Sequence, residues 1–148
     1  MFELEDGMDS KGSAVWKGGF KDGHGLISAA SGVLKDVGYS VGSRFEGDKG
    51  TNPEELIAAA HAACFSMALS LMLEKAGMKP ESIQTRATVT LNKAGDGFEI
   101  AASHLDVTAK VPGADEASFR EVAGKASRDC PVSKVLKARI DMDARLET

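Results

Sequence analysis

The chain has little cysteine, few aromatic residues and no excess of basic charge. Its 148 residues include only two cysteines, which excludes a small fold held together by several disulfides. The formal net charge of −4 argues against a nucleic-acid partner and against binding to an anionic membrane. The N-terminus, MFELEDGMD, is acidic and lacks the basic stretch that precedes the apolar stretch of a secretory signal. We therefore expect a cytoplasmic protein.

Two cysteines in a cytoplasmic chain seldom form a permanent structural bridge, so they are metal ligands, inert core residues or redox-active thiols. His61 and Cys64 lie three residues apart and would share a helix face. A zinc site needs four ligands, however, and the other candidates, His24, His104 and Cys130, are scattered along the sequence. We predict no metal and no cofactor.

One stretch is long and almost free of charge: residues 51–77, TNPEELIAAAHAACFSMALSLMLEKAG. Asn52 followed by Pro53 is typical of a helix start, and Gly77 is typical of a helix end. A helix that is apolar on nearly every side is either a membrane span or a core helix covered by other elements. The alanine-rich composition, a histidine and acids at both ends favour the core helix. Cys64 lies in its middle, where burial alone would raise the thiol pKa.

The other segments follow strand or helix patterns with short connections. Strands are predicted at residues 13–20, 26–31, 38–47, 85–93, 98–111 and 140–146, with a second helix at 114–129 and a helical turn after Pro131. The order β-β-β-α-β-β-α-β, with hairpins, predicts an α+β fold with largely antiparallel sheets. The core-facing positions of the fifth strand change parity, which requires a bulge near residues 102–104. We expect one domain, 12–148, after a tail, 1–11.

The second cysteine stands in a different local setting, the motif Cys-Pro-Val-Ser at residues 130–133. If Pro131 begins a helical turn, Cys130 is its N-cap, where backbone N–H groups favour a thiolate. On local grounds Cys130 is therefore the better thiolate, unless a cation approaches Cys64. Two buried and inert cysteines are the alternative.

Arg44 is the first arginine in the chain and could supply that cation. We predict it in the short strand at 38–47, where an arginine usually keeps its charged group in water. A pair of Arg44 and a nearby glutamate beside a thiol is the functional alternative, because it would stabilise the thiolate and orient a polar substrate atom.

Three segments carry a family resemblance: SRFEG at 43–47, GTNPEELIAAAHAACFS at 50–66 and CPVSKVL at 130–136. In this order and spacing they closely resemble the OsmC branch of the OsmC/Ohr family, the osmotically inducible and organic-hydroperoxide-resistance proteins. In the Ohr branch the family arginine lies far earlier, whereas this chain has none before Arg44. The resemblance implies a thiol-dependent peroxidase that reduces organic hydroperoxides to alcohols, and hydrogen peroxide less well.

The resemblance also implies roles for particular residues. Cys64 would be the peroxidatic cysteine and Cys130 the resolving cysteine, while Arg44 and Glu54 would be the family's arginine and glutamate. The implied assembly is an intertwined homodimer around the long helices, and the implied reductant is a lipoyl-type dithiol. Ten residues separate Glu54 from Cys64, about 15 Å along one helix axis, so Glu54 would serve a shared site from a second chain.

A non-enzymatic function is the alternative to the peroxidase. The chain could form a dimeric pocket for a hydrophobic ligand, or serve a stress response without chemistry, with both cysteines inert. Thiol titration separates these alternatives, because an inert cysteine reacts slowly near neutral pH.

Overall fold

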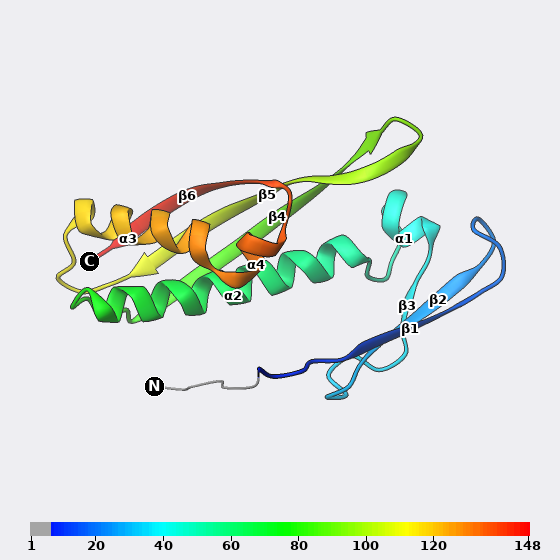
Figure 1. The fold of residues 1–148 in the computed structure, drawn as a ribbon, viewed down its shortest axis with the longest axis horizontal. Coiled ribbons are helices and arrows are strands. Elements are labelled where there is room, and N and C mark those ends of the chain that lie inside the picture. The colour runs from blue at the N-terminus through cyan, green and yellow to red at the C-terminus, as the bar shows by residue number, and fades with distance from the viewer. Residues whose placement is uncertain (1–6) are drawn as a thin grey trace. The chain divides into compact units, whose positions relative to one another are not determined.

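The computed structural model of the protein describes residues 7–148, and contacts divide the chain into two compact units, Met1–Pro53 and Glu54–Thr148 (Figure 1). Of the predicted tail, residues 7–11 belong to no helix or strand, and residues 1–6 lie outside the described part. The single domain at 12–148 stays a prediction. Each unit is described by itself.

The first unit holds a three-stranded antiparallel sheet in the order β1-β2-β3, formed by Gly12–Lys17, His24–Ala29 and Val37–Tyr39. The register places Gly25 of the middle strand between Trp16 and Tyr39. A Cβ atom at Gly25 would lie 2.2 Å from the Tyr39 ring. The missing side chain therefore lets the two rings approach, with their centroids 5.4 Å apart.

The predicted third strand is wrong over its second half. The strand ends at Tyr39, and residues Val41–Phe45 form the short helix α1. Ser40 is the N-cap: its hydroxyl accepts a hydrogen bond from the Ser43 N–H (3.2 Å), and the Ser43 hydroxyl accepts one from the Ser40 N–H (2.9 Å). This capping box satisfies two backbone donors and favours a helical turn over an extended chain. Arg44 therefore lies on a helix, not in an apolar strand.

The second unit contains three helices and one mixed sheet: α2 (Pro53–Lys75), β4 (Ser82–Ala94), β5 (Gly97–Lys110), α3 (Glu116–Asp129), α4 (Pro131–Val135) and β6 (Arg139–Glu147). β4 and β5 form the predicted hairpin, whereas β6 runs parallel to β5 because α3 and α4 cross over between them. The predicted α+β fold, its element order and the predominance of antiparallel pairs are confirmed.

The predicted bulge lies one residue before its expected range. Thr90 pairs with Ala102 and Leu91 pairs with Ile100, so Ala101 is the extra residue of β5. A bulge of this kind changes which alternate side chains of a strand face the core. From Ser103 onward, the odd-numbered side chains of β5 are buried.

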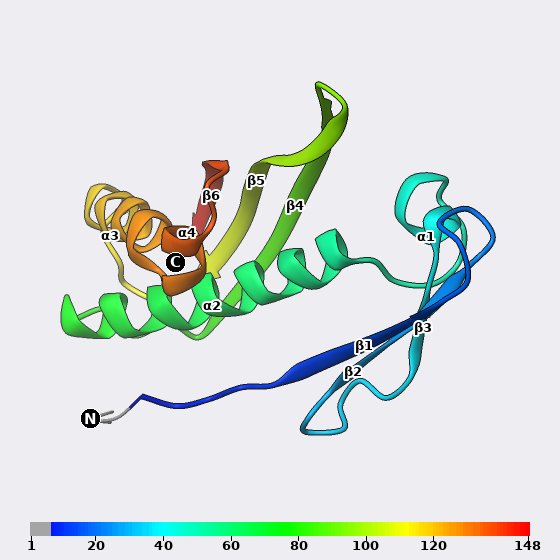
Figure 2. The ribbon, with the colours of Figure 1, turned by 45° about the vertical axis from the view of Figure 1, so that its right-hand side comes forward.

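Helices α2 and α3 cover the same face of the sheet β4-β5-β6 (Figures 1 and 2). Every member of the core between them is a buried apolar side chain: Phe65, Leu69, Leu73, Leu105, Val107, Ala109, Val111, Phe119, Ala123, Ala126 and Cys130. Burial of this apolar surface is the main force that holds the helices on the sheet. It also brings the middle of α2 to the junction of α3 and α4.

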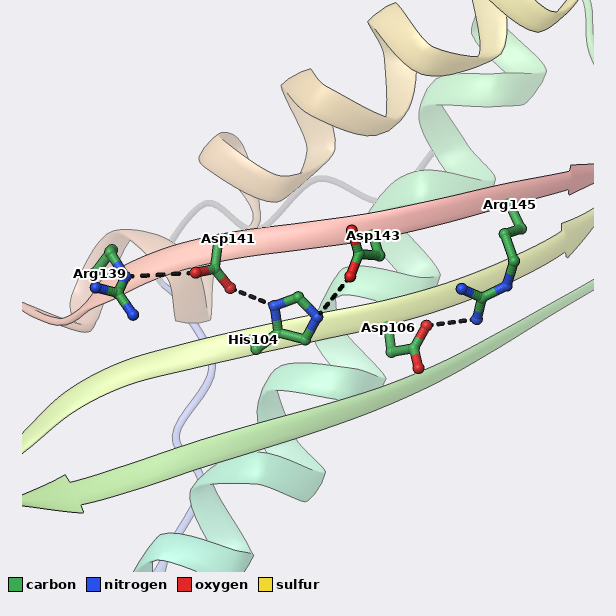
Figure 3. Close-up of polar contacts among 6 residues, drawn as sticks. All are labelled: His104, Asp106, Arg139, Asp141, Asp143 and Arg145. Carbon is green, nitrogen blue, oxygen red and sulfur yellow. Dashed lines mark hydrogen bonds and ion pairs between the residues drawn. The ribbon is translucent and has the colours of Figure 1, made fainter.

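The opposite face of this sheet is charged (Figure 3). His104 contacts both Asp141 and Asp143, and Arg145 pairs with Asp106. The hydrogen bond to Asp141 raises the pKa of His104 above its usual value. Because these side chains are exposed, solvent screens the pairs and each contributes little to stability. We interpret this face as a solvated surface.

Only one stripe of α2 is buried within the chain: Glu54, His61, Phe65, Leu69 and Leu73. By length and composition α2 could cross a membrane, but the core helix of a soluble protein passes the same test. Just 22% of its most apolar window is buried, so the predicted complete covering of this helix is not achieved within a single chain. Met67 on the other side is 77% exposed.

Candidate active site

Cys130 ends α3 and caps α4 at the same time. It is the C-cap of one helix and the N-cap of the next, and Pro131 is the first residue of α4, as the sequence predicts. The Ser133 N–H donates to the Cys130 sulfur at 3.4 Å. The side chain is completely buried, and the thiol is free. The α3–α4 junction thus fixes the position of this sulfur.

Cys64 lies about three turns after the start of α2, and it is partly buried and also free. Burial raises the pKa of its thiol, a hydrogen bond to the Val132 backbone lowers it, and the hydrogen bond to the Cys130 thiol together with that thiol's charge raises it again. Cys64 also packs against the core that contains Cys130, so the two thiols lie near each other, although 66 positions separate them in the sequence. The contacts within this unit that raise the Cys64 pKa therefore disfavour its thiolate near neutral pH.

His61 lies one turn before Cys64 and is completely buried. Its Nδ1 atom is 2.7 Å from the Ser103 hydroxyl, and its Nε2 atom is 2.7 Å from the Ser133 hydroxyl. The Ser133 hydroxyl lies 3.1 Å from the Cys130 sulfur. Burial lowers the pKa of His61, which keeps the ring neutral near pH 7.

Neither Ser103 nor Ser133 is among the site residues that the sequence predicts. A signal existed for each of them. Ser133 stands three residues after the capping cysteine, where a capped helix turn brings a side chain back to its cap. Ser103 has the same parity as Leu105 and Val107, which predicts burial on the core face of β5.

Glu54 lies in the first turn of α2 and is 7% exposed. A carboxylate in the first turn is favoured by the helix dipole, so its position has a local reason. The helix is continuous from Pro53 to Lys75, which leaves the ten-residue separation from Cys64 intact. The structure therefore does not bring Glu54 to the thiol of its own chain.

Arg44 belongs to the first unit and lines an apolar pocket there. Its guanidinium carbon lies 5.3 Å from the centre of the Phe45 ring. The pocket has a volume of about 290 Å³, and all of its residues come from the first unit: Trp16, Phe20, Tyr39, Ser40, Val41, Arg44 and Phe45. A cavity with aromatic walls and one cation can hold an organic molecule that has a polar end.

The described part of the chain offers no obvious metal centre. Among residues 7–148, no group of three or more histidine, cysteine, aspartate or glutamate side chains could hold a metal ion. The site brings together two neighbouring thiols, a buried neutral imidazole and two hydroxyl groups.

Known proteins are similar to this chain in sequence and in fold. The family described as OsmC-like protein matches residues 46–145. Peroxiredoxin OsmC of Escherichia coli is 54% identical over 141 residues, which cover 95% of this chain and 99% of that protein. The structure of the organic hydroperoxide resistance protein OhrB of Bacillus subtilis gives a TM-score of 0.63 at 27% identity, over 93% of this chain and 98% of that one. An OsmC-like protein from Mycoplasma pneumoniae gives a TM-score of 0.72 at 16% identity, over 95% and 99%, a likeness of fold alone.

This chain belongs to the OsmC-like protein family. The predicted family is thus confirmed, and so is the predicted enzyme class, a cysteine-based peroxidase. The individual roles of Cys64, Cys130, Arg44 and Glu54 stay predictions.

Removal of the Cys130 thiol should change the pKa of Cys64. Cys130 acts on Cys64 in two ways, through a hydrogen bond and through charge, and both raise the Cys64 pKa. In Cys130→Ala both effects are lost, so the Cys64 pKa should fall. The rate of iodoacetamide alkylation of Cys64, followed by peptide mapping against pH, should have its midpoint at a lower pH than in the wild type. An unchanged or higher midpoint would show that Cys130 does not raise the pKa of Cys64.

Proposed function

We propose that the protein reduces organic hydroperoxides to alcohols, with Cys64 as the peroxidatic cysteine and Cys130 as the resolving cysteine. The observation that carries the proposal is the proximity of two free thiols, which pack in one core and influence each other's ionisation, in an OsmC-like chain. A disulfide requires the two Cα atoms to come within about 7 Å, and the packing of Cys64 against the core that contains Cys130 favours such an approach. Relatives named organic hydroperoxide resistance protein support the substrate class.

The reaction has two chemical steps within the protein. The Cys64 thiolate attacks the distal oxygen of the hydroperoxide, the O–O bond breaks, and the alkoxide takes up a proton to leave as an alcohol. Cys64 is then a sulfenic acid. The Cys130 sulfur attacks the Cys64 sulfur, the S–O bond breaks, and water leaves as the disulfide forms. An external dithiol reopens the disulfide by exchange and becomes oxidised itself.

Arg44 supplies the cation that the first step needs. Burial and the neighbouring thiol both raise the pKa of Cys64, so an opposite charge must offset them for a thiolate to form near neutral pH. A guanidinium can also orient the peroxide oxygens through its N–H donors. In this proposal Glu54 pairs with Arg44 and fixes its orientation, as the family resemblance implies.

The apolar pocket around Arg44 supports an organic hydroperoxide over hydrogen peroxide. Five of its residues have aromatic or aliphatic side chains, and Trp16, Phe20 and Phe45 are all at least 36% exposed. An alkyl or aryl group bound there would remove this apolar surface from water. Hydrogen peroxide has no such group to bind.

The active assembly in this proposal is an intertwined homodimer. Most of the apolar surface of α2 is not buried within one chain, and Met67 and Leu71 are 77% and 44% exposed. Exposed apolar surface of this extent on a long helix is typical of a subunit interface. The second chain would cover α2 and would also bring its own Glu54 to a site shared with Cys64.

The remaining parts of the proposal follow the family resemblance. The reductant is a dithiol of the lipoyl type, no cofactor or metal is used, and neither nucleic acid nor a membrane is a partner. Residues 12–148 act as one functional domain in the cytoplasm, and residues 1–11 are a tail. The apolar pocket also favours a second candidate function, the binding of a hydrophobic ligand without chemistry.

A peroxide-consumption assay tests the proposed function. Wild type supplied with dihydrolipoamide should consume cumene hydroperoxide faster than hydrogen peroxide, and faster than with thioredoxin as reductant. Cys64→Ser should show no turnover, because a hydroxyl is neither ionised at neutral pH nor readily oxidised. Arg44→Met should slow turnover, since each unit added to the Cys64 pKa corresponds to about 1.4 kcal/mol between its protonation states. Binding of cumene hydroperoxide without consumption would favour the ligand-binding alternative.

The shared site predicts that activity depends on assembly. Wild type should sediment as a dimer at micromolar concentration. Two inactive variants, Cys64→Ser and Glu54→Gln, should regain activity when they are mixed and reassembled, because one of the two sites in the mixed dimer combines an intact Cys64 with an intact Glu54 from the other chain. A fully active monomer would contradict the shared site, and so would a mixture without regained activity.

A further inference from the structure

A continuous hydrogen-bonded path runs through the core beside the two thiols. It leads from Ser103 on β5 to His61 on α2, then to Ser133 on α4, and ends at the Cys130 sulfur. The first two contacts are 2.7 Å and the last, to sulfur, is 3.1 Å. His61 and Ser103 are completely buried, and Ser133 is 7% exposed. The mechanism above gives none of Ser103, His61 and Ser133 a role.

One tautomer of His61 gives the path a direction for a proton. If the Nδ1–H of His61 donates to the Ser103 hydroxyl, the Nε2 atom is an acceptor and the Ser133 hydroxyl donates to it. The Ser133 oxygen then keeps its lone pairs for the Cys130 S–H. The same backbone turn supplies a second contact, because the Ser133 N–H donates to the Cys130 sulfur. That N–H would stabilise the sulfur once its proton has left.

We propose that His61 is a positioning residue for the resolving step. It accepts the proton of the Cys130 thiol through the Ser133 hydroxyl. The proposal rests on the proposed function, since it needs Cys130 to attack a Cys64 sulfenic acid. Ser133 touches the reacting sulfur and His61 acts through it. The general-base role thus belongs to the His61–Ser133 pair.

The protons and electrons of this step balance without any further reagent. As the Cys130 sulfur bonds to the Cys64 sulfur, its proton passes to the Ser133 oxygen while the Ser133 proton passes to His61 Nε2. The S–O bond of the sulfenic acid breaks, and its oxygen leaves with the bonding pair. That oxygen takes up a proton and departs as water, and His61 returns to its neutral form once its own proton is released. The sulfenic acid is the oxidant, so one disulfide and one water are the only products.

The surroundings of His61 favour a neutral ring, which can accept a proton, over a permanently charged one. Burial lowers its pKa, and no charged group in the described part of the chain contributes to that shift. The titratable neighbours are Cys64, one turn along α2, and Cys130, reached through Ser133. The neutral ring is available as a base above its lowered pKa.

The test separates hydrogen bonding from proton acceptance with His61→Gln. Glutamine can hydrogen-bond to serine hydroxyls but cannot take up a proton near neutral pH. The protein is mixed with one equivalent of cumene hydroperoxide, and the reaction is quenched at successive times. The amount of dimedone adduct measures sulfenic acid formation, and the loss of free thiol measures disulfide formation. We expect sulfenic acid to form as fast as in the wild type, and the disulfide to form at least about tenfold more slowly at pH 7.

The pH profile gives a second measurement that a purely structural role would not change. Disulfide formation in the wild type should depend little on pH above the pKa of His61. In His61→Gln the rate of disulfide formation should rise about tenfold per pH unit, because only the fraction of Cys130 that is already a thiolate can react. Ser133→Ala should behave as His61→Gln does, and it decides the matter if His61→Gln does not fold.

Ser66→Ala is the matched control, because it removes a partly buried hydroxyl from α2 that pairs with Thr85 at 2.7 Å, outside the path. It should form the disulfide at the wild-type rate. Wild-type rates and a wild-type pH profile in His61→Gln, or in Ser133→Ala, would overturn the role of His61 while leaving the peroxidase intact. Absence of a Cys64 sulfenic acid in the wild type itself would instead overturn the proposed function.

Discussion

The proximity of the Cys64 and Cys130 thiols is the constraint on which the rest of the site depends. It exists because α2 and α3 pack on one face of the same sheet and bury Phe65 and Phe119 in a common core. The turn from α3 into α4 then carries Cys130 back toward the middle of α2. An ordinary packing requirement, the burial of apolar surface, thus brings together two sulfurs that lie far apart in the sequence.

The polar groups inside this apolar core are all matched. His61 has a hydroxyl at each ring nitrogen, and within the described residues no buried side-chain nitrogen or oxygen lacks a hydrogen-bond partner. An unmatched buried imidazole would cost stability, whereas a satisfied network fixes the orientation of its members. Ser133 joins this network to the Cys130 sulfur. The same contacts that satisfy the core therefore also set the geometry of the resolving thiol.

The sequence predicted the elements that have strong local signals. Pro131 after Cys130 indicated the capped turn, Gly77 marked the end of the long helix, and the change of parity in β5 indicated a bulge. The strand predicted at Arg44 was wrong. The alternating apolar residues favoured a strand, but the capping box of Ser40 and Ser43 favours a helical turn there. The network of His61 could not be predicted, since its partners come from β5 and α4 and meet only through tertiary packing. The assembly likewise depends on a surface of α2 that a single chain leaves exposed.

Intact-mass analysis after one equivalent of cumene hydroperoxide tests the central claim most directly, because it measures what the two thiols become. Wild type should lose about 2 Da as the disulfide forms, and Cys130→Ser should gain about 16 Da as Cys64 keeps one oxygen. An excess of peroxide should then carry Cys130→Ser to the sulfinic and sulfonic acids while wild type stays at the disulfide. If neither protein changed in mass, the two thiols would be inert and the account would be wrong.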